Sequence, residues 1–261
     1  MSVVRKSQPV STVRLVPPNP YGYIFLLAET DPASVATDVD RVEFVPVAPE
    51  HESLSRRRAV LHRTAKPLGS ALSALAEVRS VSVFEAILFG PGSLDKYERR
   101  GGGGRRARYD TLILIETTSP ATAQALLAGP DLDALMILAK ADRAVLKAFP
   151  VRNAKKIADV DRTTGGVFLF NFFFADDTEA LLNIWDRTAQ WWFAEGGMHN
   201  SELMLPLQAQ DTEYALINNA RWDDATAAAN AFRNPDYWDF VLANIEANQA
   251  TAMPSLYRLV G

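Results

Sequence analysis

The segment Gly166 to Ala175, with the sequence GVFLFNFFFA, is the strongest constraint on what this chain can fold into. Its aromatic residues favour a β-strand, and because both of its faces are apolar, both must be buried. A strand of this kind lies in the middle of a sheet that is covered on each side. The rest of the chain therefore has to supply a layer of packing for each face of that sheet.

The residues after this strand predict the order β-α-β-β-α-β. Asp176 and Glu179 resemble an N-terminal capping box, and the apolar stripe of the helix that follows ends at Gly196. Asp223 is the predicted cap of a second helix. The remaining predicted elements are strands 201–207 and 213–221, a helix through Phe232 that continues after Pro235, and a strand 253–260. This order is the ferredoxin-like split βαβ pattern.

The N-terminal half fits the same order, which predicts two tandem repeats. The segment TLILIETTSPATAQA from Thr111 aligns without gaps on ALINNARWDDATAAA from Ala215. The predicted elements are strand 21–28, helix 54–76, strand 78–89, strand 109–117, helix 121–139 and strand 145–151. The predicted divisions are an N-terminal extension, 1–20, a first repeat, 21–153, a linker, 154–165, and a second repeat, 166–261.

Each repeat alone would leave one apolar face of a four-stranded sheet uncovered. The most economical cover is the sheet of the other repeat, with the helices outside. The predicted fold class is therefore α+β, with two ferredoxin-like repeats forming a single-chain dimeric α+β barrel whose interior can hold a ligand. We expect a monomer with an internal pseudo-dimer, or a homodimer of such chains.

Charge and hydropathy narrow the range of partners. The net charge of −4 argues against nucleic-acid binding, which normally shows as a basic excess. No apolar run reaches the roughly 18 residues that cross a bilayer. The N-terminal sequence lacks the continuous apolar core of a secretion signal, and the chain has no cysteine. These features predict a cytoplasmic protein without nucleic-acid or membrane partners.

Polar side chains inside apolar strands are the best candidates for a site, because a buried amide must find hydrogen bonds or cost a few kcal/mol. Asn171 interrupts the first strand of the second repeat. Asn218 shares a predicted strand face with Tyr214 and Trp222, since alternate residues point to the same side. Glu85 lies among apolar residues of the first repeat in the same way. These side chains could equally make structural hydrogen bonds.

His199 lies at a predicted junction between helix and strand, and histidine is the residue type best suited to act as a base near neutral pH. It is the candidate general base. Trp192 lies on the apolar stripe of the preceding helix, where its ring could contact a substrate or pack in the core. The three histidines show no metal-ligand spacing, so no metal site is predicted.

The second repeat resembles the antibiotic biosynthesis monooxygenase family of the dimeric α+β barrel superfamily. The resemblance rests on GVFLFNFFF, on the tryptophan-containing helix that ends in Gly-Gly, on the hairpin, and on ARW followed by DDATAAANAF and PDYWDF. It covers residues 166–260, whereas the first repeat matches only by the order of its elements.

Members of this family that oxidise anthrone-type polyketides to quinones use an Asn and a Trp four residues apart on the third strand, as Asn218 and Trp222 are here. The resemblance implies a cofactor-independent monooxygenase acting on an aromatic or polyketide-like small molecule. The amide would stabilise a substrate enolate that reduces dioxygen directly. The residues that would line the substrate pocket are Asn171, Trp192, Tyr214 and Glu85.

The sequence departs from these enzymes at the start of the next helix, where residues 227–229 are alanines and no tyrosine is present. No arginine partner stands out besides Arg233. A non-catalytic small-molecule binding protein therefore stays an alternative, as does a cyclase or isomerase that uses Glu85 or His199 as a proton shuttle. The haem-degrading members of the superfamily need a histidine late in the second helix, and residues 238–243 contain none.

The first repeat lacks the candidate polar residues. In the gapless alignment Leu114 and Thr118 take the places of Asn218 and Trp222, and Leu26 takes roughly that of Asn171. We therefore expect a single site in the second repeat, with the first repeat closing the barrel.

Overall fold

The structure is a computed structural model, and it describes residues 13–37, 56–90, 94–99, 101, 104–130, 132–133 and 145–261. Parts of the predicted N-terminal extension and of the helices predicted at 54–76 and 121–139 lie outside these residues.

The described chain contains two successive β-α-β-β-α-β units, as predicted. The first consists of β1 (Gly22–Glu29), the continuous helical segment α1 (Arg56–Val60), η3 (Leu61–Ala65) and α2 (Lys66–Leu72), β2 (Val78–Phe89), β3 (Thr111–Thr117), α4 (Pro120–Leu127) and β4 (Val145–Ala158). The second consists of β5 (Val167–Ala175), α6 (Thr178–Ala194), β6 (Ser201–Pro206), β7 (Leu216–Trp222), α7 (Ala225–Arg233), η4 (Tyr237–Leu242), α8 (Ala243–Glu246) and β8 (Ala250–Leu259). Two short helices, η1 (Pro32–Ser34) and α3 (Leu94–Glu98), were not predicted.

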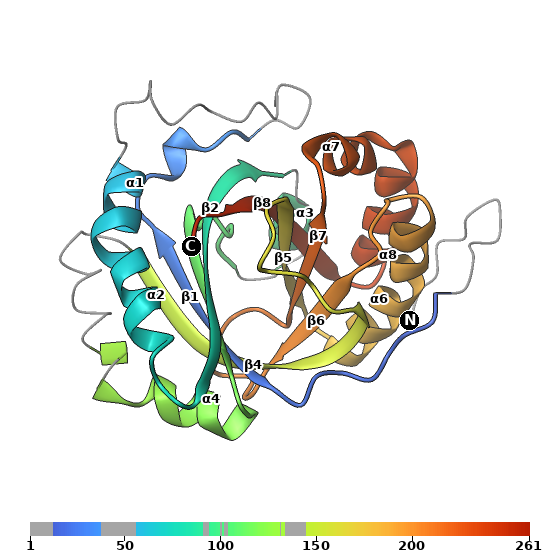
Figure 1. Ribbon diagram of the computed structural model, residues 1–261. Coiled ribbons are helices and arrows are strands. Elements are labelled where there is room, and N and C mark those ends of the chain that lie inside the picture. The colour runs from blue at the N-terminus through green and yellow to red at the C-terminus, as the bar shows by residue number, and fades with distance from the viewer. Residues whose placement is uncertain are drawn as a thin grey trace.

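The strands close into one antiparallel barrel in the order β1-β3-β2-β8-β5-β7-β6-β4. Each unit contributes four adjacent strands, and the units meet along the β2–β8 and β4–β6 pairs. Figure 1 shows the helices of the first unit on one side of the barrel and those of the second unit on the other. The predicted α+β barrel in a single chain is therefore confirmed.

Strand β4 is longer than the sequence predicts. It continues through Ala158, and Lys155 and Lys156 pair with β6 of the second unit. The first residues of the predicted linker are therefore part of the barrel wall, because an edge strand of one unit gains backbone hydrogen bonds by pairing with the edge strand of the other.

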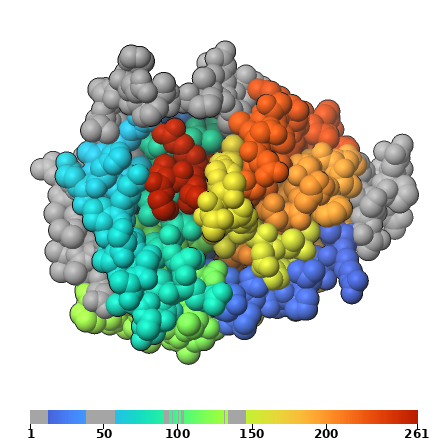
Figure 2. All heavy atoms as spheres, viewed as in Figure 1, coloured from blue at the N-terminus to red at the C-terminus, as the bar shows by residue number. Residues whose placement is uncertain are grey.

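The C-terminus is attached to the first unit. The backbone N–H of Val260 donates to the carbonyl of Val83 at 2.8 Å, and Gly261 accepts from the N–H of Val83. In Figure 2 these last residues, in red, lie beside the cyan helical segment that contains α2. The C-terminal end of β8 thus helps to hold the two units together.

Aromatic side chains fill the interior of the barrel. Alternate residues of β5 point inward, and the rings of the first two of them, Phe168 and Phe170, contact those of Phe25 and Phe84 with centroids 5.0 to 5.9 Å apart. These inward residues are Phe168, Phe170, Phe172 and Phe174. The prediction of a ligand chamber inside the barrel is wrong for this reason: rings from both units take up the space and contact one another edge to face.

The two units correspond with a shift of one residue relative to the gapless alignment. Strands β3 and β7 start at Thr111 and Leu216, and the helices after them are capped by Ser119 and Asp224. Ile113, rather than Leu114, is therefore the counterpart of Asn218. The sheet register agrees, because Leu26 pairs with Ile113 in the first unit as Asn171 pairs with Asn218 in the second. A slip of one residue exchanges the two faces of a strand.

One end of the barrel interior holds a buried ionic cluster. Arg162, from the connection between β4 and β5, forms an ion pair with Glu202 of β6, whose side chain is 1% exposed. The Arg162 guanidinium also donates to Oδ1 of Asn219 at 2.8 Å and 3.2 Å. The amide nitrogen of Asn219 donates to the carbonyl of Leu169 at 3.1 Å. This cluster attaches the connection between the units to the barrel.

Three tyrosines near the opposite end predict sensitivity to alkali. The hydroxyls of Tyr109 and Tyr214 lie 2.7 Å apart, and the hydroxyl of Tyr257 donates to the carbonyl of Tyr109 at 2.7 Å. Burial raises the pKa of Tyr109 to about 12, and it raises the pKa of Tyr214 and Tyr257 well above the ordinary value. Because tyrosine in an unfolded chain ionises near pH 10, at about its ordinary pKa, the folded protein retains these protons to a higher pH.

The free energy of unfolding should therefore be constant with respect to these groups below about pH 10 and should fall as the pH rises towards about 12. Urea unfolding at several pH values between 8 and 11.5, roughly the range below and above the unfolded pKa, measures the slope. In Tyr214→Phe the free energy of unfolding should fall less steeply with pH, because one titrating group fewer contributes. An unchanged slope in that variant would contradict the assignment.

Within the described residues, no helix is both long enough and apolar enough to cross a membrane.

Candidate functional site

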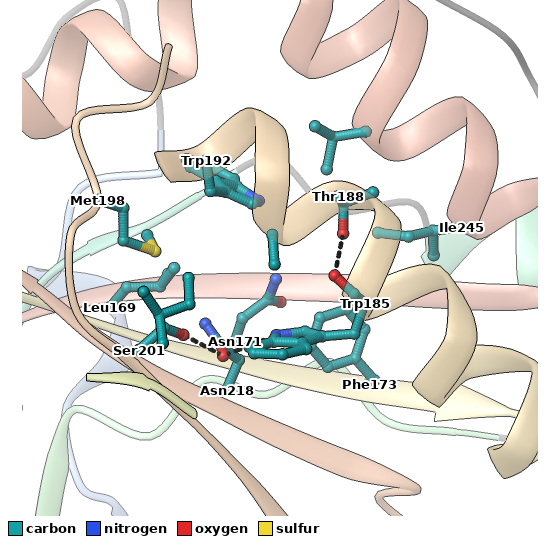
Figure 3. A pocket seen from close by; sticks show the side chains of 13 residues that line it. Leu169, Asn171, Phe173, Trp185, Thr188, Trp192, Met198, Ser201, Asn218 and Ile245 are labelled. Atoms are coloured by element: carbon teal, nitrogen blue, oxygen red, sulfur yellow. Dashed lines mark hydrogen bonds between the residues drawn. The ribbon is translucent and has the colours of Figure 1, made fainter. Parts of the chain in front are cut away.

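The candidate site is a cavity between the sheet of the second unit and the helices that cover it (Figure 3). Its floor comes from β5, β6 and β7, and its roof from α6, η4 and α8. The cavity has a volume of about 20 Å³, which is enough for one or two water molecules. The lining residues are Ile157, Leu169, Asn171, Phe173, Trp185, Thr188, Ala189, Trp192, Met198, Ser201, Asn218, Val241 and Ile245.

The cavity depends on the position of helix α6. Its N-cap is Asp177, whose side chain accepts from the N–H of Ala180 at 2.9 Å, so the predicted cap at Asp176 is wrong by one residue. Asp176 instead accepts from the hydroxyl of Tyr97 at 2.9 Å. The helix ends shortly before Gly197, which has a φ of +63°, in the left-handed region that favours glycine.

Asn218 is held in one orientation at the cavity. Its Oδ1 accepts from the indole N–H of Trp185 at 3.0 Å and from the hydroxyl of Ser201 at 2.7 Å (Figure 3). Since an indole nitrogen can only donate, this contact identifies the amide oxygen and therefore also the amide nitrogen. The Asn218 nitrogen has no hydrogen-bond partner among the described residues. A donor pair on a fixed amide is thus available to a ligand.

Asn171 lies directly across the β5–β7 pair from Asn218. Its side chain is 7% exposed, and its Oδ1 is buried with no hydrogen-bond partner in the part of the chain that the structure describes. Leaving such an acceptor unpaired costs about 1–3 kcal/mol. A ligand hydroxyl or a water in the cavity could supply the missing donor. The two amides therefore offer donors and an acceptor side by side.

The rest of the lining is apolar or already satisfied. The Thr188 hydroxyl donates to the carbonyl of Ile184 at 3.1 Å, and the Ser201 hydroxyl donates to Asn218. None of the lining residues is an acid, a base or a lysine. The lining can therefore hydrogen-bond an oxygen atom of a ligand against apolar walls, but it holds no side chain that would take a proton.

Trp192 lines the cavity, as predicted, although its role in binding stays a prediction. Its ring also contacts Trp222, Phe232 and Tyr237 with centroids 5.7 to 6.0 Å apart. It therefore connects the cavity to the aromatic core of the helical layer.

The structure does not place Trp222 at the cavity. Its indole N–H donates to the carbonyl of Gly196 at 2.8 Å, and its side chain is 2% exposed among the rings that pack beneath α7. The structure therefore brings Asn218 but not Trp222 to the cavity, and the catalytic role of the pair stays a prediction. Both side chains lie on the same sheet face, but Trp222 lies at the end of the strand, where it joins the turn after α6 to the sheet.

Trp222→Phe should accordingly lower stability and leave the cavity intact. Loss of the indole leaves the carbonyl of Gly196 without its donor, so we expect a loss of about 1–3 kcal/mol in the free energy of unfolding. Chemical denaturation measures the loss. Aromatic ligands should bind the folded variant as they bind the parent protein, and a selective loss of binding without a loss of stability would contradict this assignment.

Three other predicted residues do not line the cavity. His199 is exposed, and its ring lies edge-on to that of Phe193 with the centroids 4.9 Å apart. It does not line the cavity in which its predicted role as a base would be carried out. Tyr214 points into the barrel interior, because it precedes β7 and does not follow the alternation of that strand. Glu85 belongs to the first unit and forms ion pairs with Arg58 and Arg258.

The sequence reasoning missed Trp185 and Ser201 as members of the site. Trp185 lies on the predicted apolar stripe of α6, one turn before Thr188 and two before Trp192, and so faces the sheet. Ser201 begins β6, and the β6–β7 register places it near Asn218. The sequence signal that could have identified Ser201 is a polar residue at the start of a strand that neighbours the strand of Asn218.

Solved structures with similar folds were found. One is described as an anthrone oxidase-like protein, with a TM-score of 0.58 and 13% identity over 93% of this chain and 92% of that chain. Another, from Fusobacterium nucleatum, is named for a suspected monooxygenase activity, with a TM-score of 0.50 and 7% identity over 92% and 94%. The chain has the dimeric α+β barrel fold. No protein-family model and no curated protein sequence matches it.

A mutant chlorite dismutase from Candidatus Nitrospira defluvii aligns at a TM-score of 0.48 and 10% identity over 93% of this chain and 92% of that chain. Within the described ranges, no three His, Cys, Asp or Glu residues are grouped so that they could bind a metal ion.

Proposed function

We propose that the protein is a cofactor-independent monooxygenase that oxidises an aromatic or polyketide-like small molecule in the cavity beneath α6. The observation that carries the proposal is the amide of Asn218, whose oxygen is held by Trp185 and Ser201 so that its nitrogen can donate to a ligand. Such a donor, fixed before the reaction, stabilises negative charge that develops on a substrate oxygen. The similarity of fold to an anthrone oxidase-like protein supports the same class of reaction.

The reaction converts an activated CH₂ group flanked by aromatic rings into a carbonyl. Loss of one proton gives an enolate whose oxygen accepts from the Asn218 amide. The enolate carbon transfers electrons to dioxygen and forms a C–O bond, and the resulting peroxide anion takes up one proton from water to give a hydroperoxide. Loss of water from this hydroperoxide gives the ketone, so that one O₂ is consumed and one H₂O is released for each CH₂ oxidised. Substrate is the electron donor throughout.

The composition of the cavity restricts the substrate. Because no lining residue is an acid or base, the first proton must pass to water, and the substrate must be acidic enough to ionise near neutral pH once its enolate is stabilised. A phenolic or enolisable ring system fits this requirement. Its hydroxyl could also donate to the unpaired Oδ1 of Asn171.

Oxygen uptake with an anthrone is the direct test. We expect consumption of dioxygen in proportion to quinone formed, at a rate that is first order in protein and well above the spontaneous oxidation. Product analysis with ¹⁸O₂ should show one labelled oxygen in the quinone. A rate equal to that of buffer would reject the proposal for this substrate class, and unlabelled product would reject the oxygenation chemistry.

A non-catalytic binding protein is the second candidate. The absence of a base from the cavity lining favours it, since binding needs only the apolar walls and the two amides. Tight binding of an anthrone or naphthol without any change in its rate of oxidation would support this candidate. The cyclase or isomerase alternative has less support, because Glu85 and His199, its predicted proton shuttles, do not line the cavity.

A further inference from the structure

A second cavity lies next to the first beneath α6. Its volume is about 10 Å³. Its lining residues are Phe173, Leu181, Ile184, Trp185, Thr188, Leu216 and Ile245, of which Phe173, Trp185, Thr188 and Ile245 also line the first cavity. The first cavity contains the two amides, whereas the second is lined by apolar residues and Thr188. The two spaces are therefore neighbours that share four residues of lining.

Trp185 is the largest of the shared residues. It is 7% exposed, and its indole N–H donates a hydrogen bond to Oδ1 of Asn218 at 3.0 Å. Figure 3 shows the indole lying across the floor of the site between Asn218 and Phe173. Neither cavity alone has room for an aromatic ring, since pockets for such ligands are about 300–1,000 Å³. A ligand can be accommodated only if a lining side chain moves.

We propose that Trp185 separates the two cavities and determines the size of the ligand that the site accepts. When the indole leaves its place, the two cavities and the volume of the indole form one continuous slot with the amides at one end. The Asn218 oxygen keeps the hydrogen bond from Ser201 at 2.7 Å, so the amide stays oriented while the indole is displaced. The inference rests on the proposed function only in taking this cavity as the ligand site.

The displacement also has a hydrogen-bond consequence. The indole N–H loses its acceptor on Asn218, and a ligand hydroxyl can reach the unpaired Oδ1 of Asn171 across the strand pair. A hydroxylated aromatic should therefore bind better than the same ring system without the hydroxyl. This preference distinguishes the slot from an apolar cavity that the deletion of a side chain would leave elsewhere in the core.

The test is binding of phenol, naphthalene and 1-naphthol, measured by calorimetry in the absence of oxygen. Trp185→Ala should bind 1-naphthol at least about tenfold more tightly than the parent protein does, and Trp185→Phe should fall between them. In Trp185→Ala, 1-naphthol should bind about tenfold more tightly than naphthalene, a preference that the further change Asn171→Leu reduces by removing one of the two amides. Phenol should gain least, because it needs the least room.

Trp191→Ala is the matched control, because Trp191 is a fully buried tryptophan of the same helix that lines neither cavity. It should give no preference for the hydroxyl. Equal affinity for 1-naphthol in the parent protein and in both Trp185 variants would overturn the inference, as would an equal gain in Trp191→Ala. Since no turnover is measured, a failure of the oxygenase proposal would appear separately, as absent oxygen uptake in the parent protein.

Discussion

Asn218→Ala is expected to lower the rate of oxygen uptake with an anthrone by about 100-fold or more, because removing one fixed donor at a developing oxyanion typically costs that much. The loss should appear mainly in kcat, since the hydrogen bond from the amide strengthens as charge forms on the substrate oxygen. Steady-state oxygen consumption measures it. A rate within about threefold of the parent protein would remove Asn218 from the reaction.

Asn219→Ala provides the matched control, because this adjacent asparagine points to the other face of the sheet. Its amide bonds Arg162 and the carbonyl of Leu169 inside the barrel, away from the cavity. The variant should be less stable while its oxygen uptake per folded molecule stays unchanged. If both asparagine variants lost activity in proportion to their lost stability, the effect of Asn218→Ala would be structural.

Arg162→Met is expected to cause the largest loss of stability from a single side-chain change at the barrel end. Its guanidinium pairs with Glu202, whose carboxylate is 1% exposed and also accepts from the N–H of Val160 at 3.3 Å. Removing one partner of a buried ion pair leaves an uncompensated charge and costs about 3–5 kcal/mol. Denaturation in guanidinium chloride at neutral pH measures the change.

Two further variants define the origin of that loss. Arg162→Met combined with Glu202→Leu should recover part of the stability, because no buried charge is then left without a partner. Asp223→Asn breaks the ion pair with Arg221 at a position that is 87% exposed, and it should cost at most about 1 kcal/mol. A loss in Arg162→Met no larger than in Asp223→Asn would show that the buried cluster adds little.

The elements of the second unit could be predicted from the sequence because their patterns are unambiguous. The apolar residues of β5 favour a doubly buried strand, and the stripe on α6 has helical spacing. The barrel followed from the need to cover both sheets. The length of β4 could not be predicted, because Lys155 and Lys156 suggest solvent exposure, whereas Lys156 is 7% exposed in the fold. Its ammonium group pairs with Asp159 and Asn19.

The face on which the site lies was predicted wrongly, and the reason is physical. Strand alternation puts Asn171 on the same face as Leu169 and Phe173, but it cannot say which of two apolar faces meets the other sheet. The outcome depends on volume: the phenylalanines at alternate positions of β5 fill the barrel, and the face with the amide is left for the helices. Trp185 and Ser201 depend on contacts between elements, which spacing within one element does not reveal.

Leu26 and Ile113 occupy in the first unit the places that Asn171 and Asn218 occupy in the second. In a barrel assembled from two identical chains, each substitution would alter both sheet-and-helix layers together. A destabilising polar pair would then lower the stability of both layers. Here the two layers vary independently, so the first can remain a dense apolar support while the second tolerates unsatisfied groups. Random mutagenesis should therefore find the apolar layer the less forgiving of polar replacements, and saturation with ligand should require one equivalent per polypeptide.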